Sequence, residues 1–170
     1  MTAKTDATRT DEDWMREAIA LAIREKGTDP ADTPIAALVV RGGKLVASGV
    51  NRTAEDCDAT AHAEIVALRA AGKQVGEMKV EGATLYSTLQ PCGMCTMASI
   101  WAGVERIVFG AGRDDVHEMY FEDRNLDTID FVRDAYKDDL MLDGGVLPKD
   151  CAKLYFGPDD DVPEDMQANQ

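Results

Sequence analysis

Four side chains in two short stretches have the residue types and the spacing of a metal site. His62 and Glu64 lie two residues apart in the first stretch. Cys92 and Cys95 form a C-x-x-C pair in the second, directly after Pro91. One imidazole and two thiolates are zinc ligands, and a C-x-x-C turn lets both sulfurs reach one ion. Three protein ligands leave one position of a tetrahedral zinc open for water, which is typical of a catalytic site rather than a structural one.

Both stretches are expected to lie at the beginning of a helix. Residues 61–72 are predicted to form a short helix because apolar residues recur in it and Gly72 is placed to end it. Residues two apart point to different sides in mid-helix, so His62 and Glu64 can face one ion only in the first turn. Pro91 suits a first helical position, which puts both cysteines at a second helix N-terminus, whose partial positive charge favours thiolates.

The pattern H-x-E followed by P-C-x-x-C is the signature of zinc-dependent deaminases. From about residue 11 to residue 156 the chain resembles the cytidine deaminase-like superfamily. The resemblance implies one zinc ion per chain, bound by His62, Cys92 and Cys95. Such an ion lowers the pKa of the water that it binds toward about 7. It also implies that Glu64 takes a proton from this water and passes it to the ring nitrogen and the leaving amine. The products would be the oxo base and ammonia.

Four further positions are candidates for the site, and three of them also have a structural interpretation. Asn51 lies where family members often have an asparagine that binds the substrate base, although asparagine is also a common turn residue. Cys57 either supplies a fourth ligand, which would close the site, or is a spectator thiol, the interpretation that we favour. Trp101 either lines the substrate pocket or fills the core beneath it. The resemblance assigns Ala63 to substrate binding, together with Asn51 and Trp101.

The elements around these residues predict an α/β fold with three layers, α-β-α, and a mixed five-stranded sheet. Thr10 is expected to cap the first helix and Gly27 to end it, and Gly42-Gly43 is a hairpin signal between the first two strands. The hairpin pair is antiparallel, and helical crossovers are expected to make the later pairs parallel. The strands are expected at 33–40, 44–51, 83–89, 105–110 and 138–142, and the helices at 11–26, 61–72, 93–102, within 113–139 and at 148–156.

Two branches of the superfamily, which act on different substrates, are alternatives for this chain. The T-A-H-A-E run at 60–64, the segment 89–92 and the ending 144–151 resemble bacterial tRNA adenosine deaminases. Bacterial guanine deaminases of the same fold are resembled by the tryptophan at 101 and by the aromatic-acidic run 121–123.

Asp123 is the most specific of the guanine deaminase marks, since it falls 28 residues after Cys95. In that group an acid at this point is a second proton-handling residue beside the glutamate, which makes Asp123 a catalytic candidate with Glu64. A carboxylate there suits the N1–H and 2-amino donors of guanine. The structural alternative is an acid that caps the helix before Leu126.

The charge of the chain favours a small substrate over a nucleic acid. The net charge is −14, and residues 111–170, with 17 acidic and 6 basic residues, contribute −11 of it. Such a surface repels a polyanion, because nucleic-acid binding depends on Lys and Arg that neutralise phosphates. We therefore expect a free nucleobase or nucleoside, guanine first, with tRNA adenosine and cytosine or cytidine as alternatives. A zinc-stabilised binding module without turnover is a candidate of another class, and it would need a fourth protein ligand.

The remaining composition predicts one cytoplasmic domain. We expect residues 1–10 to be disordered, residues 11–156 to form a single zinc deaminase domain and residues 157–170 to be an acidic tail. Residues 1–10 lack the apolar run of a signal peptide, and no segment approaches the roughly 20 apolar residues of a membrane span. Four cysteines, two of them candidate zinc ligands, do not indicate a disulfide framework. The resemblance also implies a homodimer, since this fold commonly forms dimers in the family.

Overall fold

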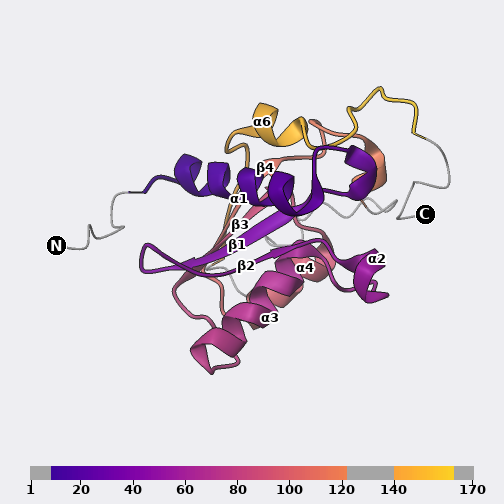
Figure 1. The fold of residues 1–170 in the computed structure, drawn as a ribbon. Helices are drawn as coiled ribbons and strands as arrows, with labels where there is room; N and C mark the ends of the chain where they lie inside the picture. Colours follow the sequence, from indigo (N-terminus) through magenta and orange to yellow (C-terminus); the bar gives the residue numbers. More distant parts are fainter. Residues whose placement is uncertain (1–8, 122–139, 163–170) are drawn as a thin grey trace.

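A five-stranded sheet forms the middle layer of the fold (Figure 1). The structure is a computed structural model and describes residues 9–121 and 140–162. The strand order is β2-β1-β3-β4-β5, and the pairs β3–β4 and β4–β5 are parallel. The strands are β1 (Ala36–Arg41), β2 (Lys44–Val50), β3 (Ala83–Leu89), β4 (Arg106–Ala111) and β5 (Met141–Asp143). The predicted α/β fold with a mixed five-stranded sheet is confirmed.

The pairing of β3 corrects one expectation about the sheet. The prediction that all pairs after the hairpin are parallel is wrong for β3, which lies antiparallel to β1, with Ala37 opposite Ser87. The crossover from β2 passes through α3 (Ala63–Val75) and skips over β1, so β3 runs in the direction of β2 without being its neighbour. The hairpin itself forms as predicted, because Gly42 and Gly43 both have positive φ, 58° and 70°.

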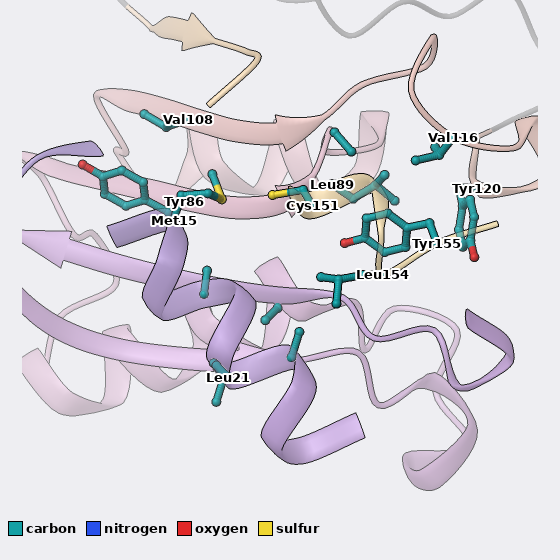
Figure 2. Close-up of a cluster of buried hydrophobic side chains, with 14 of the residues drawn as sticks. Met15, Leu21, Tyr86, Leu89, Val108, Val116, Tyr120, Cys151, Leu154 and Tyr155 are labelled. Carbon is teal, nitrogen blue, oxygen red and sulfur yellow. The ribbon is translucent and has the colours of Figure 1, made fainter. Parts of the chain in front are cut away.

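Helices α1 (Asp11–Lys26) and α6 (Pro148–Ala152) cover one face of the sheet (Figure 1). The predicted N-cap of α1 is present, since Thr10 and Asp13 accept from each other's backbone N–H in a capping box. Burial of each large apolar side chain against this helix contributes about 1.5–3 kcal/mol. Figure 2 shows how side chains from α1, the strands and the C-terminal segment meet in this core; they include Met15, Leu21, Tyr86, Val108, Cys151 and Leu154.

An ion-pair network holds the start of α1 on the sheet. The guanidinium of Arg106 on β4 donates to both carboxylate oxygens of Asp11, at 2.8 and 2.7 Å. The hydroxyl of Tyr86 on β3 donates to the same carboxylate at 2.8 Å. The Arg106 guanidinium holds the pKa of Asp11 below its ordinary value. The first turn of α1 is therefore tied to two central strands by charge-assisted hydrogen bonds.

Helices α3 and α4 (Gly93–Trp101) cover the opposite face of the sheet (Figure 1). Side chains alternate along β1, so that Leu38 and Val40 belong to the core under α1. Their neighbours Ala37 and Val39 belong to the core under α3. The two cores give the three layers that the sequence predicts.

The two helices that carry the candidate ligands differ from the prediction at their ends. α3 continues through Gly72 and stops at Gly76, which has a left-handed φ of 73°. α4 begins at Gly93 with Cys92 as its N-cap, so Pro91 precedes the helix instead of being its first residue. The predicted helix N-termini at the histidine and at the cysteine pair are nevertheless both present.

A buried hydroxyl pair connects the C-terminal segment to the end of β3. The Tyr155 hydroxyl donates to Thr88 Oγ1 at 2.6 Å, and the same oxygen accepts from the backbone N–H of Ala36 at 3.1 Å. The Tyr155 ring also packs edge-on against Tyr120, with 5.2 Å between the ring centroids (Figure 2). Because Thr88 lies four residues before Cys92, this pair supports the chain just ahead of the cysteine turn.

The packed domain is wider than residues 11–156. Arg9 lies over the ring of Trp14, 3.6 Å from its centroid, and Val162 is buried in the core under α1. Most of the helix expected within 113–139 lies outside the described residues, and its first part instead contains a 3-10 turn at Glu118–Tyr120. β5 begins three residues later than expected, and α6 ends four residues earlier. Within the described ranges, no helix is long and apolar enough to cross a membrane.

Candidate metal centre and active site

The strand order brings the two ligand-bearing stretches to one edge of the sheet. β2 and β3 run in the same direction on either side of β1, so their C-terminal ends lie at the same edge. From β2 the chain passes through the short helix α2 (Thr53–Asp56) to α3, whose N-cap is His62. From β3 it passes directly to α4, whose N-cap is Cys92. Two helix N-termini, each with a partial positive charge, therefore meet at this edge.

Gly49 on β2 allows α3 to lie directly against the strand. A Cβ at this position would lie 2.6 Å from the backbone nitrogen of Ala67 and 2.7 Å from the carbonyl oxygen of Ala63. These are backbone atoms, which cannot rotate away as the end of a side chain can. The absence of a side chain at Gly49 thus sets how closely the first turn of α3 approaches the sheet, and with it the position of His62 and Glu64.

The three predicted ligands are assembled around one point. Nδ1 of His62 lies 3.7 Å from the sulfur of Cys92 and 3.7 Å from the sulfur of Cys95. Zinc with Zn–S bonds of about 2.3 Å and Zn–N bonds of about 2.0–2.1 Å in tetrahedral geometry separates such atoms by about 3.6 Å. The distances from the histidine nitrogen to both sulfurs therefore match those expected around a zinc ion. In the parts of the chain that the structure describes, His62, Cys92 and Cys95 are the one cluster of His, Cys, Asp or Glu able to hold a metal.

Cys57 does not belong to this cluster. It is exposed at the end of α2, with a left-handed φ of 48°, and its sulfur contacts the carbonyl oxygen of Ala54 at 3.8 Å. The spectator interpretation of this thiol is therefore the one that the structure supports. With three ligands from the described residues, the centre has the open type expected of catalytic zinc.

The two cysteines differ in their protonation. The hydrogen bond from the Cys95 thiol lowers the pKa of Cys92 to about 4, against the effect of burial. The same hydrogen bond, together with burial, raises the pKa of Cys95. The pair of sulfurs therefore gives up one proton more easily than the second. A metal that binds both sulfurs as thiolates displaces the protons that they carry.

Glu64 lies beside the cluster without joining it. The residue is 4% exposed, and its Oε2 lies 3.5 Å from the Cys95 sulfur. Burial raises the pKa of Glu64, and the negative charge of Cys92 adds to the rise. A carboxyl group whose pKa moves from its usual range toward neutrality is suited to take up and return a proton.

Ser87 is a contact that the sequence interpretation missed. Its hydroxyl donates to Glu64 Oε1 at 3.2 Å, and the residue is completely buried. A signal for it exists in the alternation along β3, because Ala83 and Leu85 face the core under α3, and Ser87 is the next residue on that face. A small hydroxyl residue on an otherwise apolar buried face indicates a polar partner.

The remaining predicted site residues lie in different surroundings. Asn51 is 7% exposed and follows β2 directly, and Ala63, fully buried, is the first residue of α3. Trp101 ends α4 and is 70% exposed, so the interpretation that it fills the core is wrong. Asp123 lies outside the described residues. Substrate binding by Asn51, Ala63 and Trp101 stays a prediction.

Comparison with known proteins decides the class of the site. Residues 8–111 match the family model described as the cytidine and deoxycytidylate deaminase zinc-binding region. The chain belongs to this family of zinc deaminases. The deaminase is 34% identical over 141 residues to the tRNA-specific adenosine deaminase of Buchnera aphidicola, a match that covers 83% of this chain and 88% of the relative. It is 33% identical over 112 residues to the guanine deaminase of Bacillus subtilis, covering 66% of this chain and 71% of the relative.

The solved structures agree with the fold of the deaminase. The guanine deaminase of Nitrosomonas europaea superimposes with a TM-score of 0.69 and 26% sequence identity, over 88% of each chain. The predictions of a zinc cofactor and of a hydrolytic deaminase are confirmed by the family match and by the geometry of the ligand cluster. The relatives divide between a tRNA and a free base as substrate.

Proposed function

We propose that this deaminase acts on a small nucleobase or nucleoside, and on free guanine first, converting guanine and water to xanthine and ammonia. The observation that carries the choice of a small substrate is the charge of the loop between Asn51 and the metal centre. A tRNA deaminase needs positive side chains that are free to contact phosphates.

The basic residues in and against this loop are paired with carboxylates of the loop itself. Arg52 forms a bidentate contact with Asp56, with the shortest distance 2.7 Å, and Arg69 contacts Asp58 at 3.3 Å. Lys26 at the end of α1 pairs with a third loop carboxylate, that of Glu55. The described part of the loop and its contacts therefore offers three cations and three anions, which gives a polyanion no net attraction.

The chemistry follows from the buried groups at the ligand cluster. Zinc, when bound, supplies a Lewis acid that makes water a nucleophile at neutral pH. Glu64 takes one proton from the attacking water and delivers it to the ring nitrogen, and it then carries the second proton, from the hydroxyl group added to the ring carbon, to the leaving amine. Ser87 holds one carboxylate oxygen of Glu64, which leaves the other oxygen on the side of Cys95. The buried surroundings of Glu64 keep bulk water from competing for that proton.

The second candidate is the deamination of adenosine in tRNA, which the similarity to the Buchnera enzyme favours. One experiment separates the two candidates. Ammonia release is measured with guanine, guanosine, adenine, adenosine, cytosine, cytidine and a tRNA anticodon stem-loop at equal concentration and at two salt concentrations. Guanine is expected to have the highest kcat/KM. Faster turnover of the stem-loop, falling steeply with salt, would overturn the proposal in favour of the tRNA activity.

An apolar stripe on α4 that ends in an exposed tryptophan supports a homodimer as the assembly. The helix has no charged residue in its nine positions. Met94, Met97 and Trp101 follow one another at helical spacing; the two methionines are partly buried, and Trp101 is 70% exposed. We expect the wild type to be a dimer by light scattering and Trp101→Glu to be a monomer. Met78→Glu, at a residue 87% exposed after α3, is the control and should remain a dimer. A monomeric wild type would contradict this assembly.

A further inference from the structure

We propose that Thr33 and Thr53 are positioning residues that fix the side-chain amide of Asn51, so that its carbonyl oxygen faces the substrate. The site then selects a substrate edge that carries an N–H donor. This inference rests on the proposed function, since it assigns a specificity role at the same site. Three observations carry it: the use of both amide hydrogens, the backbone of Thr33, and the position of Asn51 beside the metal centre.

Both hydrogens of the Asn51 amide are engaged by the protein. Nδ2 donates to Thr33 Oγ1 at 3.0 Å and to Thr53 Oγ1 at 3.3 Å. A primary amide has two N–H donors and one acceptor oxygen, so these two bonds use all of its donor capacity. Within residues 9–121 and 140–162, these are the two hydrogen bonds of the Asn51 side chain, and neither uses Oδ1. The oxygen is therefore the group of this buried residue that is left for a ligand.

Thr33 has a backbone conformation that a β-branched residue rarely adopts. Its φ of 46° and ψ of 65° lie in the left-handed region, and it is one of three non-glycine residues with positive φ in the described ranges. The conformation is fixed on both sides, because its N–H donates to Pro30 O at 3.1 Å and its carbonyl oxygen accepts from Ile35 N at 2.7 Å. Strain of this kind occurs where the surrounding structure needs a side chain in one place. Here the side chain that is placed is the hydroxyl that accepts from Asn51.

The Asn51 amide is held next to the metal ligands by the backbone. The Asn51 N–H donates to Ile35 O at 3.0 Å, which continues the pairing of β2 with β1 by one residue. The next N–H, that of Arg52, donates to Ala61 O at 2.9 Å. Because Ala61 precedes His62, Asn51 is fixed one hydrogen bond away from the chain that carries the first zinc ligand. Asn51 follows β2 at the sheet edge where both ligand-bearing stretches lie, and we therefore place the recognised edge of the substrate at this amide.

An acceptor at this position discriminates between substrates. In guanine the reacting carbon, C2, carries the amino group that leaves as ammonia, and one ring atom beside it is the donor N1–H. In adenine the ring nitrogen beside the reacting carbon, N1, is an acceptor. An acceptor oxygen facing an acceptor nitrogen leaves both unpaired, and a site built for a hydrogen bond rejects a ligand that cannot make it. With the hydroxyls of Thr33 and Thr53 removed, the amide is free to turn its NH2 group toward the substrate, and this discrimination is lost.

The test uses single and double valine variants, which keep the shape of threonine without the hydroxyl. Thr33→Val with Thr53→Val is expected to raise the KM for guanine about tenfold, the worth of one hydrogen bond, with kcat changed less than about threefold. Thr33→Ser with Thr53→Ser keeps both hydroxyls and should restore the KM to within about threefold of wild type. Zinc content and thermal unfolding are measured on every variant. Thr53→Val alone is included because Thr53 has no left-handed backbone, so an effect of this variant cannot come from backbone strain.

Asn51→Asp decides which end of the amide faces the substrate. A carboxylate offers only acceptors, so guanine turnover should be retained within about tenfold, whereas Asn51→Leu should lose it. Loss with Asn51→Asp equal to that with Asn51→Leu, or an unchanged KM in the double valine variant with zinc and folding intact, overturns the inference. If wild type prefers another member of the substrate panel, the proposed guanine activity fails, and the same variants assayed on that preferred substrate judge the role of Asn51 separately.

Discussion

Replacement of Gly49 by alanine tests whether the contact between β2 and α3 positions the catalytic groups. The added methyl would lie 2.6 Å from the backbone nitrogen of Ala67, where ordinary contact begins at 3.4 Å. The helix must therefore move away from the strand by up to about 0.8 Å, because the two backbone atoms that meet the methyl cannot move independently of the helix. Overpacking of this kind costs about 1–3 kcal/mol, which lowers Tm by roughly 2–12 °C for a chain of this size.

The same displacement reaches the metal centre. His62 and Glu64 lie in the first turn of the helix that moves, whereas both cysteines belong to another helix. A misplacement of about 1 Å in a catalytic group costs about 10²-fold in rate. We therefore expect Gly49→Ala to lower kcat/KM for the best substrate about 10²-fold and to weaken zinc retention, beyond what its loss of stability explains at 25 °C.

Zinc content, Tm and ammonia release are measured side by side on Gly49→Ala and on a matched glycine variant. Gly112→Ala is the control, because its methyl would meet nothing closer than 3.4 Å and the glycine has no positive φ. This control should remain within about 0.5 kcal/mol of wild type in stability. Wild-type zinc content and turnover in Gly49→Ala would refute the idea that this contact sets the position of the first turn of α3.

Four further results are expected. Cys92→Ala should lose most of the zinc measured by atomic absorption, while Cys57→Ser should keep one zinc per chain; loss in the latter would indicate a closed structural site. Glu64→Ala should keep zinc and fold but lose about 10²–10⁴-fold in turnover, and normal deamination would exclude its proton role. Ser87→Ala should lower kcat more than it changes KM, with recovery in Ser87→Thr; an equal loss in both variants would point to packing alone. Asp11→Asn should lower the unfolding free energy by about 1 kcal/mol at pH 7, a value reduced for partial exposure.

The pH dependence of the Asp11 effect has a definite sign. Its arginine partner lowers the pKa of the folded carboxylate below the ordinary value of 3.8. The carboxylate therefore contributes stability above the unfolded pKa, and this contribution is lost as the pH falls through the folded pKa. Urea unfolding of wild type and Asp11→Asn should give curves that differ at pH 7 and converge once the pH has fallen below the folded pKa of Asp11. A difference that persists unchanged at low pH would assign the effect to packing instead of charge.

The features that follow from neighbouring residues were predictable from the sequence. The turn of Cys92 and Cys95, the cap of α1 and the glycine hairpin each depend on a few adjacent residues, and all are present. The end of α3 is also a local feature, but the prediction that Gly72 ends the helix is wrong, because a helix can continue through a glycine. Gly72 instead lies close to the carbonyl oxygen of Glu77, where the chain turns back. The helix stops only at Gly76, which takes the left-handed conformation.

The features that depend on distant pairing were not predictable in this way. The antiparallel contact of β3 with β1 requires knowledge of which strand the crossover passes over, and periodicity contains no such information. The same holds for the contact of Ser87 with Glu64, which joins residues 23 positions apart in the sequence. The exposure of Trp101 likewise reflects which face of α4 meets the sheet, and an aromatic residue in a short apolar helix fits either face.

The hydrogen bond between Tyr155 and Thr88 has a consequence for the synthesis of the chain. The two residues are 67 positions apart, so at about 5–20 residues per second the tyrosine leaves the ribosome's catalytic centre roughly 3–13 s after the threonine. During that interval both zinc-binding cysteines have been made, but the segment that supports the end of β3 has not. Nascent chains therefore pass through a stage in which two thiols are available to metal ions and oxidants before their surroundings are complete.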